Sequence, residues 1–339
     1  MTGKCIYNDS RVNNIDWAEN IAIVDLSYMT YARFYAVKLW YLETFPEKKG
    51  NMPPDYNWTA DEIFMQKFKQ IFTKKLFEIC YQRDIPISNI VFVTDCHHVD
   101  NWRVLYASDY KATRKDSHVK QNFHNFDIFP IIKDSVIYEM QKRYGNLVLR
   151  HNNLEADDIV YLLIRAVVNY RQLSERNIFI VANDRDYVQL CDLRQIHLID
   201  LSNNDISDEI LSKMTVCEFL LQKIICGDVS DNILACYIPK SVLDMVGIKT
   251  GRQQLKGTPV LVKSILSNVV TRKMCDDALG MIRQGMRALP TENISIGSQF
   301  TKNAILADMA NIPKKYGGAM NNIFYKCGII CFNLALDNA

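Results

Sequence analysis

Short apolar runs and longer helical patterns alternate along the first two thirds of the chain. Strands are predicted by the runs at 21–26, 89–95, 146–150, 177–182 and 196–201. Helices are predicted by the spacing of apolar residues at about 27–43, 60–82, 129–143, 156–170 and 185–191. Strands that alternate with helices are typical of βαβ units. We therefore predict an α/β fold with a central, mostly parallel sheet flanked by helices.

The pattern changes at about residue 214, after which the chain has helical and loop signals without strands. With 339 residues and 48% hydrophobic composition, a large domain with a smaller lobe is expected. We predict a core over 1–213 and a helical lobe over 214–339. Residues 100–127 are polar and lack clear periodicity.

Composition restricts the cellular setting. The sequence has no apolar stretch long enough to cross a membrane and no signal-peptide core at its start, so an intracellular protein of the cytoplasm or nucleus is expected, without a membrane partner. The ten cysteines are scattered and form no C-x-x-C pair, which favours reduced thiols over disulfides or zinc ligands.

Nine carboxylates stand at or just beyond the ends of apolar stretches. Parallel strands deliver their carboxyl ends to one edge of a sheet, so these acids are expected to converge. Converging negative charges repel one another unless divalent cations neutralise them. The candidate metal ligands are Asp25, Asp95, Glu155, Asp157, Asp158, Asp184, Asp186, Asp228 and Asp231.

Each of these acids also has a simpler structural interpretation. Acids near a helix N-terminus interact well with the helix dipole, and Asp184 could be a helix N-cap. Three acids within LEADDIV exceed what capping requires, which favours the metal interpretation. His97 and His98 adjoin Asp95, but neighbouring residues of an extended segment point in opposite directions. We therefore assign these two histidines no catalytic role.

The net charge is only +2, but the basic residues are concentrated in two segments. Five basic residues stand against two acids between 103 and 120, and seven stand against a single acid between 238 and 273. An acidic cluster paired with separate basic segments is typical of proteins with a polyanionic substrate.

The order of the acidic motifs LEADD, NDRD and GDVSDNI resembles the 5′-nuclease superfamily of flap endonucleases and 5′–3′ exonucleases, over about 21–232. The resemblance implies a PIN-like core and two bound Mg²⁺ ions, for which Mn²⁺ can substitute. It assigns four acids to the first metal site, namely Asp25, Asp95, Glu155 and Asp157. It assigns to the second site Asp158, Asp184, Asp186 and Asp231, with Asp228 as a less firm outer ligand.

The segment YKATRKD at 110–116 resembles the base of the family's helical arch, expected here over about 100–127. By that resemblance, Lys111 and Arg114 reach the scissile phosphate and Tyr110 stacks on a terminal base. Lys and Arg suit phosphate oxygens that develop charge, and stacking on unpaired bases tolerates any sequence. Lys115 is a further expected DNA contact.

The lobe departs from the family after Ile233. The family continues into a helix–hairpin–helix that holds duplex phosphates, whereas this chain has LACYIP there and a fragment, VGIKTGRQQL, that resembles the second half of the hairpin. Duplex contacts are expected from Lys240, Lys249, Arg252 and Lys256. The C-terminus contains no sliding-clamp-binding peptide.

Together these features predict a structure-selective 5′ nuclease that hydrolyses DNA at 5′ flaps or free 5′ ends, with RNA–DNA primers as further substrates, in replication, repair or recombination. Two cations about 4 Å apart would activate water and stabilise the leaving oxygen. The alternatives are a PIN-type ribonuclease, which generally lacks GDVSDNI, and a catalytically silent nucleic-acid-binding scaffold. A haloacid-dehalogenase phosphatase requires an acid where Ser27 stands.

Overall fold

The structure is a computed structural model that describes residues 15–112, 126–171, 176–285, 297–327 and 329. The chain divides into two compact units. Unit 1 comprises residues 1–101, 115–209 and 314–339, and unit 2 comprises residues 102–114 and 210–313. Each unit has its own core of buried hydrophobic residues.

Unit 1 contains a five-stranded sheet in the order β3-β2-β1-β4-β5. Every pair of neighbouring strands is parallel, which confirms the predicted α/β class. The residues of the strands are almost all buried, as expected when helices cover both faces of a parallel sheet. The strands are β1 (Ile21–Asp25), β2 (Ile90–Thr94), β3 (Leu147–Arg150), β4 (Ile178–Val181) and β5 (Ile196–Ile199).

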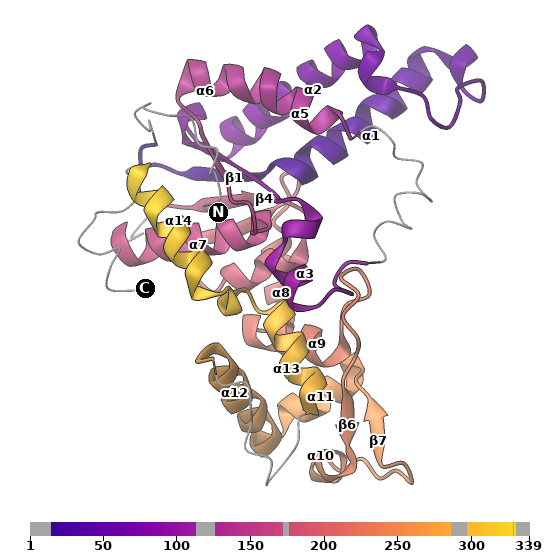
Figure 1. Cartoon of the computed structure of the whole chain (residues 1–339), viewed down its shortest axis with the longest axis vertical. Coiled ribbons are helices and arrows are strands. Elements are labelled where there is room, and N and C mark those ends of the chain that lie inside the picture. The colour runs from indigo at the N-terminus through magenta and orange to yellow at the C-terminus, as the bar shows by residue number, and fades with distance from the viewer. Residues whose placement is uncertain (1–14, 113–125, 172–175, 286–296, 328, 330–339) are drawn as a thin grey trace. The chain divides into compact units, whose positions relative to one another are not determined.

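Helices cover both faces of this sheet (Figure 1). On one side lie α1 (Leu26–Thr44), α2 (Glu62–Gln82), α5 (Ile128–Ile132) and α6 (Tyr138–Tyr144), and a π-helical segment (Lys133–Ile137) joins the last two. On the other side α7 (Ala156–Arg171) packs with α14 (Lys314–Lys326). Single 3₁₀ turns connect these elements at Pro46–Lys48, Trp58–Ala60, Ile87–Asn89 and His98–Asp100.

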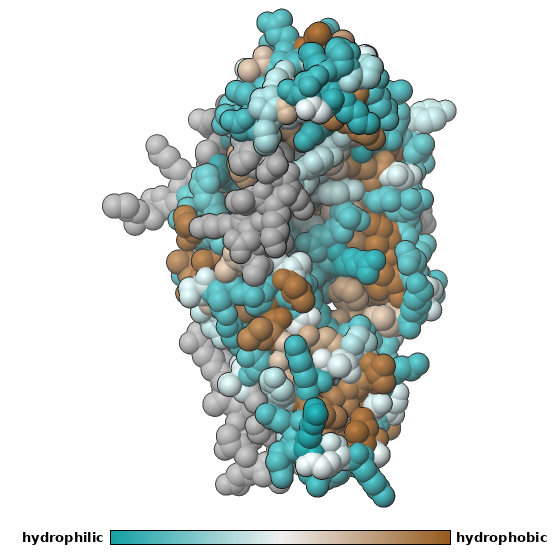
Figure 2. All heavy atoms as spheres, turned by 90° about the vertical axis from the view of Figure 1, so that its right-hand side faces the viewer, coloured by the Kyte–Doolittle hydropathy of each residue, from teal (hydrophilic) through white to brown (hydrophobic). Residues whose placement is uncertain are grey.

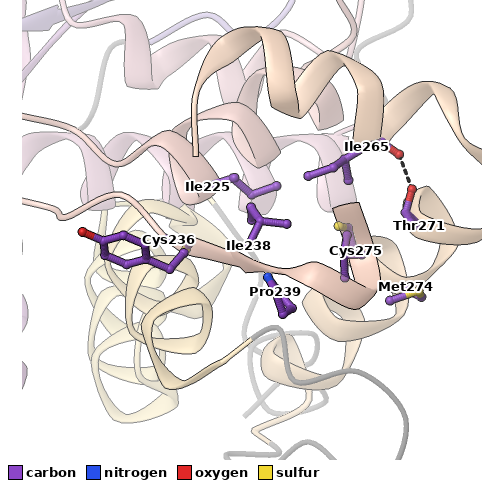
Figure 3. A pocket seen from close by; sticks show the side chains of 10 residues that line it. Ile225, Cys236, Ile238, Pro239, Ile265, Thr271, Met274 and Cys275 are labelled. Carbon is purple, nitrogen blue, oxygen red and sulfur yellow. Dashed lines mark hydrogen bonds between the residues drawn. The ribbon is translucent and has the colours of Figure 1, made fainter. Parts of the chain in front are cut away.

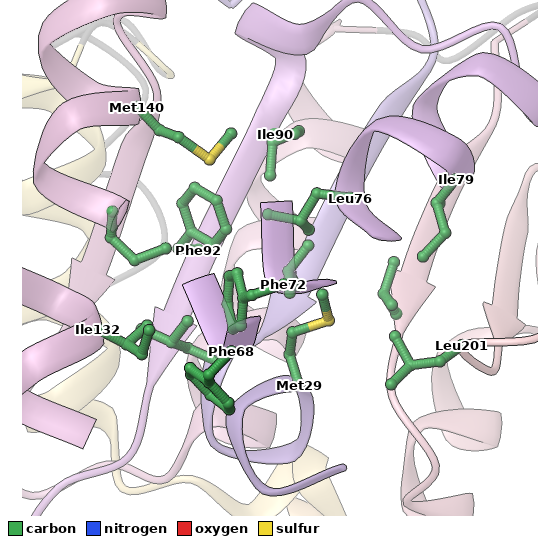
Figure 4. Close-up of a cluster of buried hydrophobic side chains, with 14 of the residues drawn as sticks. Met29, Phe68, Phe72, Leu76, Ile79, Ile90, Phe92, Ile132, Met140 and Leu201 are labelled. Carbon is green, nitrogen blue, oxygen red and sulfur yellow. The ribbon is translucent and has the colours of Figure 1, made fainter. Parts of the chain in front are cut away.

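Helix α2 illustrates how the sequence builds the main core. The Asp61 side chain accepts a hydrogen bond from the Phe64 N–H at 2.9 Å and so caps the helix. Phe68, Phe72 and Leu76 then recur every four residues on one face and are buried. Figure 4 shows them packed beside Phe92 of β2, which fixes this helix against the sheet.

Unit 2 is mainly helical. Helix α9 begins with a complete capping box between Thr215 and Glu218. The buried Asn303 side chain donates to the Ile224 and Leu234 carbonyls, each at 2.7 Å. The helices are α3 (Trp102–Tyr106), α8 (Ile206–Leu211, at the boundary), α9 (Val216–Cys226), α10 (Lys240–Met245), α11 (Pro259–Ser267), α12 (Val269–Arg283) and α13 (Gly297–Ala307), followed by a 3₁₀ turn at Met309–Asn311.

Two details differ from the sequence prediction of this region. The segment after 214 was expected to lack strands, but β6 (Tyr237–Pro239) and β7 (Gln254–Lys256) form an antiparallel pair. Strands of three residues are too short to produce a periodic signal. The segment VGIKTGRQQL at 246–255 lies between α10 and β7 and ends within that strand, and the next helix starts only at Pro259.

The unit boundaries also differ from the predicted division at 213/214. Residues 314–339 belong to unit 1, where α14 packs against α7. Residues 102–114 belong to unit 2, because Ala107 and Tyr110 are part of its hydrophobic core. Both differences arise from contacts between residues far apart in sequence, which local patterns do not contain.

A small apolar pocket lies within unit 2 (Figure 3). Its volume of about 20 Å³ is that of about one water molecule. Ile225, Ile238 and Cys275 are among the lining residues, and the Thr271 hydroxyl donates to the Ile265 carbonyl at 2.5 Å. Its size and lining fit a packing defect of the core rather than a substrate site. No helix in the described part of the chain has the length and apolar character that crossing a membrane requires.

Candidate metal centre and nucleic-acid contacts

The sheet brings three of the predicted acids to one edge. Asp25 is the last residue of β1, Asp95 directly follows β2, and Asp184 stands three residues after β4. Strand β1 lies between β2 and β4 in the sheet. Because all three strands are parallel, Asp25 lies at the centre of this edge, with Asp95 and Asp184 on its two sides.

Asp25 occupies an environment that disfavours its charge. Its Oδ1 accepts a hydrogen bond from the Tyr28 N–H at 3.0 Å, so Asp25 also caps α1. Burial, and after it the negative charge of Asp95, raise the pKa of Asp25 to about 7, with a smaller contribution from Asp184. The hydrogen bonds from Tyr28 and Tyr187 lower the pKa without cancelling this rise. This edge therefore holds more negative charge than its surroundings stabilise.

Tyr187 is a site residue that the sequence prediction did not include. Its buried hydroxyl donates to Asp25 Oδ2 at 3.1 Å. Burial raises the pKa of Tyr187 well above its ordinary value, and so do four nearby carboxylates, those of Asp25, Asp157, Asp95 and Asp184. These four predicted ligands thus surround one tyrosine hydroxyl. The only sequence signal was an aromatic residue three positions after Asp184 in NDRDY.

The N-terminus of α7 adds three acids to this region. Asp95 Oδ1 accepts a hydrogen bond from the Ala156 N–H at 2.9 Å, which joins the end of β2 to the start of the helix. Asp158 is buried, and its Oδ2 accepts from the Glu155 N–H at 3.1 Å. Asp157 Oδ1 accepts from the N–H of Asp158 at 2.8 Å. The trio therefore also serves the helix N-terminus, as the structural interpretation expected.

Cys96 lies near three of the predicted ligands, as the causes of its pKa shift indicate. Burial raises the pKa of its thiol, and the charges of Glu155, Asp95 and Asp158 raise it further.

Asp184 is the N-cap of the 3₁₀ segment Arg185–Leu190, where a short helix was predicted, and its Oδ1 accepts from the Asp186 N–H at 2.9 Å. Asp186 lies in the first turn of that 3₁₀ segment. The capping interpretation of Asp184 is thus also fulfilled.

The residues of this edge fit hard divalent cations. Carboxylate oxygens are the ligands that such cations prefer, and the raised pKa of Asp25 indicates a need for positive charge. Within the described residues, no group of three or more acidic, histidine or cysteine side chains is arranged to hold an ion. The backbone thus gathers these acids, while their side chains are not in ligating positions.

The last two predicted ligands, Asp228 and Asp231, lie in unit 2 beside Lys223, whose side chain is 8% exposed. The Lys223 ammonium is 3.0 Å from Asp228 Oδ2 and 3.6 Å from Asp231 Oδ2. Burial opposes ionisation of Asp228, but the charge of Lys223 and hydrogen bonds from Ser230 outweigh it and lower the pKa of Asp228 to about 2. Sequence reasoning missed Lys223, because a lysine in the last turn of a helix is common.

Tyr110 and Lys111, which were predicted to contact DNA, are both buried in this structure. Tyr110 is only 2% exposed and lies in the core of unit 2, so its ring offers no open face to a base in this conformation. Lys111 is 7% exposed, and its Nζ lies 3.8 Å from Asp231 Oδ1. The Lys111 N–H also donates to the Asp231 carbonyl at 2.9 Å. Arg114 and Lys115 lie outside the described residues, as does the rest of the segment 113–125 of the expected arch.

The predicted duplex contacts of unit 2 are solvent exposed. They lie around the β6–β7 pair, and none of them forms an ion pair with a residue that the structure describes; they are Lys240, Lys249, Arg252 and Lys256. Tyr237 and Met245 are exposed hydrophobic residues of the same region. In Figure 2, hydrophilic side chains project between hydrophobic ones at the lower end of the molecule. Such a surface is accessible to a polyanion.

The parallel sheet and its acidic edge define a PIN-like α/β fold. The sequence matches the profile of the 5′-3′ exonuclease, N-terminal resolvase-like domain, over residues 20–219. The chain therefore belongs to the 5′-3′ exonuclease family and is a 5′ nuclease by class. A comparison with curated protein sequences gives no significant match.

Solved structures with a similar fold come from bacteriophage T5. A flap endonuclease in a pseudo-enzyme–product complex with DNA and metal ions has 13% identity and a TM-score of 0.50, and the alignment covers 89% of this chain and 92% of that one. A T5 5′-exonuclease with bound zinc ions has 14% identity and a TM-score of 0.51, with the same coverage. At such identities the similarity establishes the fold alone.

Proposed function

We propose that this chain is a structure-selective 5′ nuclease that hydrolyses phosphodiester bonds in DNA at 5′ flaps and free 5′ ends. The observation that carries the proposal is the acidic edge of the sheet, where burial and the charge of Asp95 raise the pKa of Asp25 to about 7. Membership of the 5′-3′ exonuclease family supports a nucleic-acid substrate. The DNA bound to the T5 flap endonuclease supports DNA over RNA.

Two Mg²⁺ ions, or Mn²⁺ in their place, would supply an activated water and charge stabilisation at the leaving oxygen. Asp25, Asp95, Glu155 and Asp157 would hold the first ion. By the family resemblance, the second ion would be held by Asp158, Asp184, Asp186 and Asp231. The Tyr187 hydroxyl would orient Asp25 through its hydrogen bond at 3.1 Å.

Basic residues of unit 2 would bind the substrate. Lys111 and Arg114 are proposed to contact the scissile phosphate, where a positive charge stabilises developing negative charge. The exposed lysines and arginine around β6 and β7 are proposed to bind the duplex backbone. RNA primers paired with DNA are a second proposed substrate, and the proposed processes are replication, repair and recombination.

The test is cleavage of end-labelled single-stranded, flap, nicked and RNA-primed DNA in Mg²⁺. Wild type is expected to release short 5′ products from flaps, and Asp157→Asn is expected to lower the rate more than about 100-fold, because even partners of metal ligands change activity by about 10- to 100-fold. Asp192→Asn is the matched control, since Asp192 forms a surface ion pair with Arg165 at 3.7 Å.

Three results would contradict the proposal. Equal rates for wild type and Asp157→Asn would show that the acidic edge has no part in cleavage. Hydrolysis of single-stranded RNA without hydrolysis of flap DNA would favour the PIN-type ribonuclease instead. A protein that binds these DNAs but cleaves none of them would be a nucleic-acid-binding scaffold.

A further inference from the structure

Lys223 occupies the position between two aspartates where a cation would be expected. It stands in the last turn of α9, and its side chain is 8% exposed. Its ammonium lies 3.0 Å from Asp228 Oδ2 and 3.6 Å from Asp231 Oδ2. A lysine this buried is held by its charge partners, because an isolated ammonium is expensive to remove from water.

Two ammonium groups of the described residues approach Asp231. Lys111 approaches Asp231 Oδ1 at 3.8 Å, while Lys223 approaches Oδ2, and the Tyr110 hydroxyl lies 3.4 Å from that same oxygen. Two ammonium groups therefore face two carboxylates, those of Asp228 and Asp231. A divalent cation that binds Asp231 would meet like charges at short range.

The loop that carries the two aspartates is fixed by its backbone. Asp228 and Ile233 exchange two N–H to carbonyl hydrogen bonds of 2.8 Å. Gly227 has a φ of +75°, and a Cβ there would lie 2.7 Å from the Ala235 nitrogen, so no other residue fits. Lysine side chains are long and flexible, in contrast to this loop. If a divalent cation binds Asp231, the repulsion between it and the lysines is therefore relieved when an ammonium group moves, because the backbone of the aspartates is fixed.

We propose that Lys223 is a built-in counter-ion that competes with a divalent cation for Asp231, and that Asp228 retains Lys223 when Asp231 releases it. The proposal rests on the proposed function, which assigns Asp231 to a metal site. It gives Asp228 a role as the partner of a lysine rather than as a metal ligand. The shorter distance from Lys223 to Asp228 than to Asp231 agrees with this division of roles.

The test is Mn²⁺ binding to the full chain, measured by electron paramagnetic resonance and by thermal unfolding with and without Mn²⁺. Lys223→Met keeps the length and helix propensity of the side chain but removes the competing charge. We expect one Mn²⁺ to bind about tenfold more tightly, equivalent to about 1.4 kcal/mol. The melting temperature of the metal-free protein should fall, and its rise on Mn²⁺ binding should exceed that of wild type.

Four further variants separate this role from a merely structural one. Lys223→Arg should restore wild-type affinity, and Lys223→Gln provides a second neutral replacement. Arg272→Met removes a cation from an exposed pair with Asp276 in the same unit and should leave Mn²⁺ affinity unchanged. Asp228→Asn should have no further effect on affinity once Lys223 is Met, because Asp228 then has no lysine to retain.

Unchanged or weaker Mn²⁺ affinity in Lys223→Met would overturn the proposal, as would a wild type that binds no Mn²⁺. A further loss of affinity from Asp228→Asn in the Lys223→Met background would make Asp228 a ligand and overturn its retaining role. These readouts do not require catalysis. Tighter Mn²⁺ binding by a chain that cleaves no DNA would therefore refute the nuclease proposal and leave the role of Lys223 standing.

Discussion

The acidic edge of unit 1 and the aspartate pair of unit 2 use the same side chain under opposite electrostatic conditions. At the edge, burial and the charge of Asp95 raise the pKa of Asp25 to about 7. In unit 2, Asp228 is also desolvated, yet Lys223 and Ser230 lower its pKa to about 2. Burial alone therefore does not decide the charge state of these acids; the neighbouring charges do.

This difference shows two ways in which a folded protein accommodates clustered carboxylates. The edge in unit 1 gathers carboxylates at the cost of repulsion among them, as the charges acting on Asp25 and Tyr187 indicate. The pair in unit 2 is neutralised by protein ammonium groups. Under the proposed function, a cation would reduce the repulsion in the first region and compete with lysines in the second.

The largest effect is expected from removing the second ammonium of unit 2. Lys111→Met should lower the cleavage rate about 100-fold or more with little change in KM, because loss of one group that stabilises transition-state charge typically reduces the rate by about 10²- to 10³-fold. Single-turnover cleavage of flap DNA measures this. Lys302→Met is the matched control, since it removes an exposed pair with Asp109 at 3.0 Å. An unchanged rate would show that Lys111 neutralises Asp231 and does not stabilise the transition state.

The next largest effect concerns the neutral hydrogen bonds that hold the loop in unit 2. Asn303→Leu would remove the buried amide that donates to the Ile224 and Leu234 carbonyls, and would leave the Ile224 carbonyl only the weak Cys236 thiol donor at 3.4 Å. We expect a loss of about 2 to 3 kcal/mol in unfolding free energy, because each unsatisfied buried group costs about 1–3 kcal/mol. Urea unfolding measures it, with the exposed Asn322→Leu as control. A loss under about 0.5 kcal/mol, typical of surface changes, would contradict it.

Duplex affinity is expected to fall tenfold or less when exposed basic residues of unit 2 are replaced. Unlike Lys223, these residues have no described acidic partner. Lys240→Gln combined with Lys256→Gln should weaken duplex binding and reduce the salt dependence by about two units, since each phosphate contact contributes a slope of about 0.9. Binding titrations at several salt concentrations test this. The exposed pair Lys49→Gln and Lys142→Gln in unit 1 is the control, and an identical slope for all variants would contradict the assignment.

Regular, repeated features of the chain could be predicted from sequence. The five strands have continuous apolar runs, and the rule that parallel strands end at one edge placed Asp25, Asp95 and Asp184 together. Features that depend on contacts between distant residues could not be predicted. The burial of Tyr110, the return of α14 to unit 1 and the position of Lys223 all arise from tertiary packing. Residue type alone gave no sign of them.

The smallest effect is a pH dependence of opposite sign in the two regions of the metal-free protein. The pKa of Asp25 rises from 3.8 to about 7 on folding. The protonated side chain therefore contributes fully to the free energy of unfolding below about pH 4, and this contribution is lost as the pH rises through 7. Asp25→Asn should therefore become more stable than wild type between pH 4 and 7. A few degrees are expected, since 1 kcal/mol shifts the melting temperature by roughly 2–4 °C in domains of this size.

Asp228 should behave in the reverse way. Its pKa falls from 3.8 to about 2 on folding, so its stabilising contribution is present above about pH 4 and is lost as the pH falls through 2. Asp228→Asn should be less stable than wild type at pH 5–8, and the difference should shrink towards pH 2. Thermal unfolding in a metal chelator from pH 2 to 8 measures both variants. Parallel curves for the two would mean that neighbouring charges do not distinguish the acidic edge from the lysine-paired aspartates.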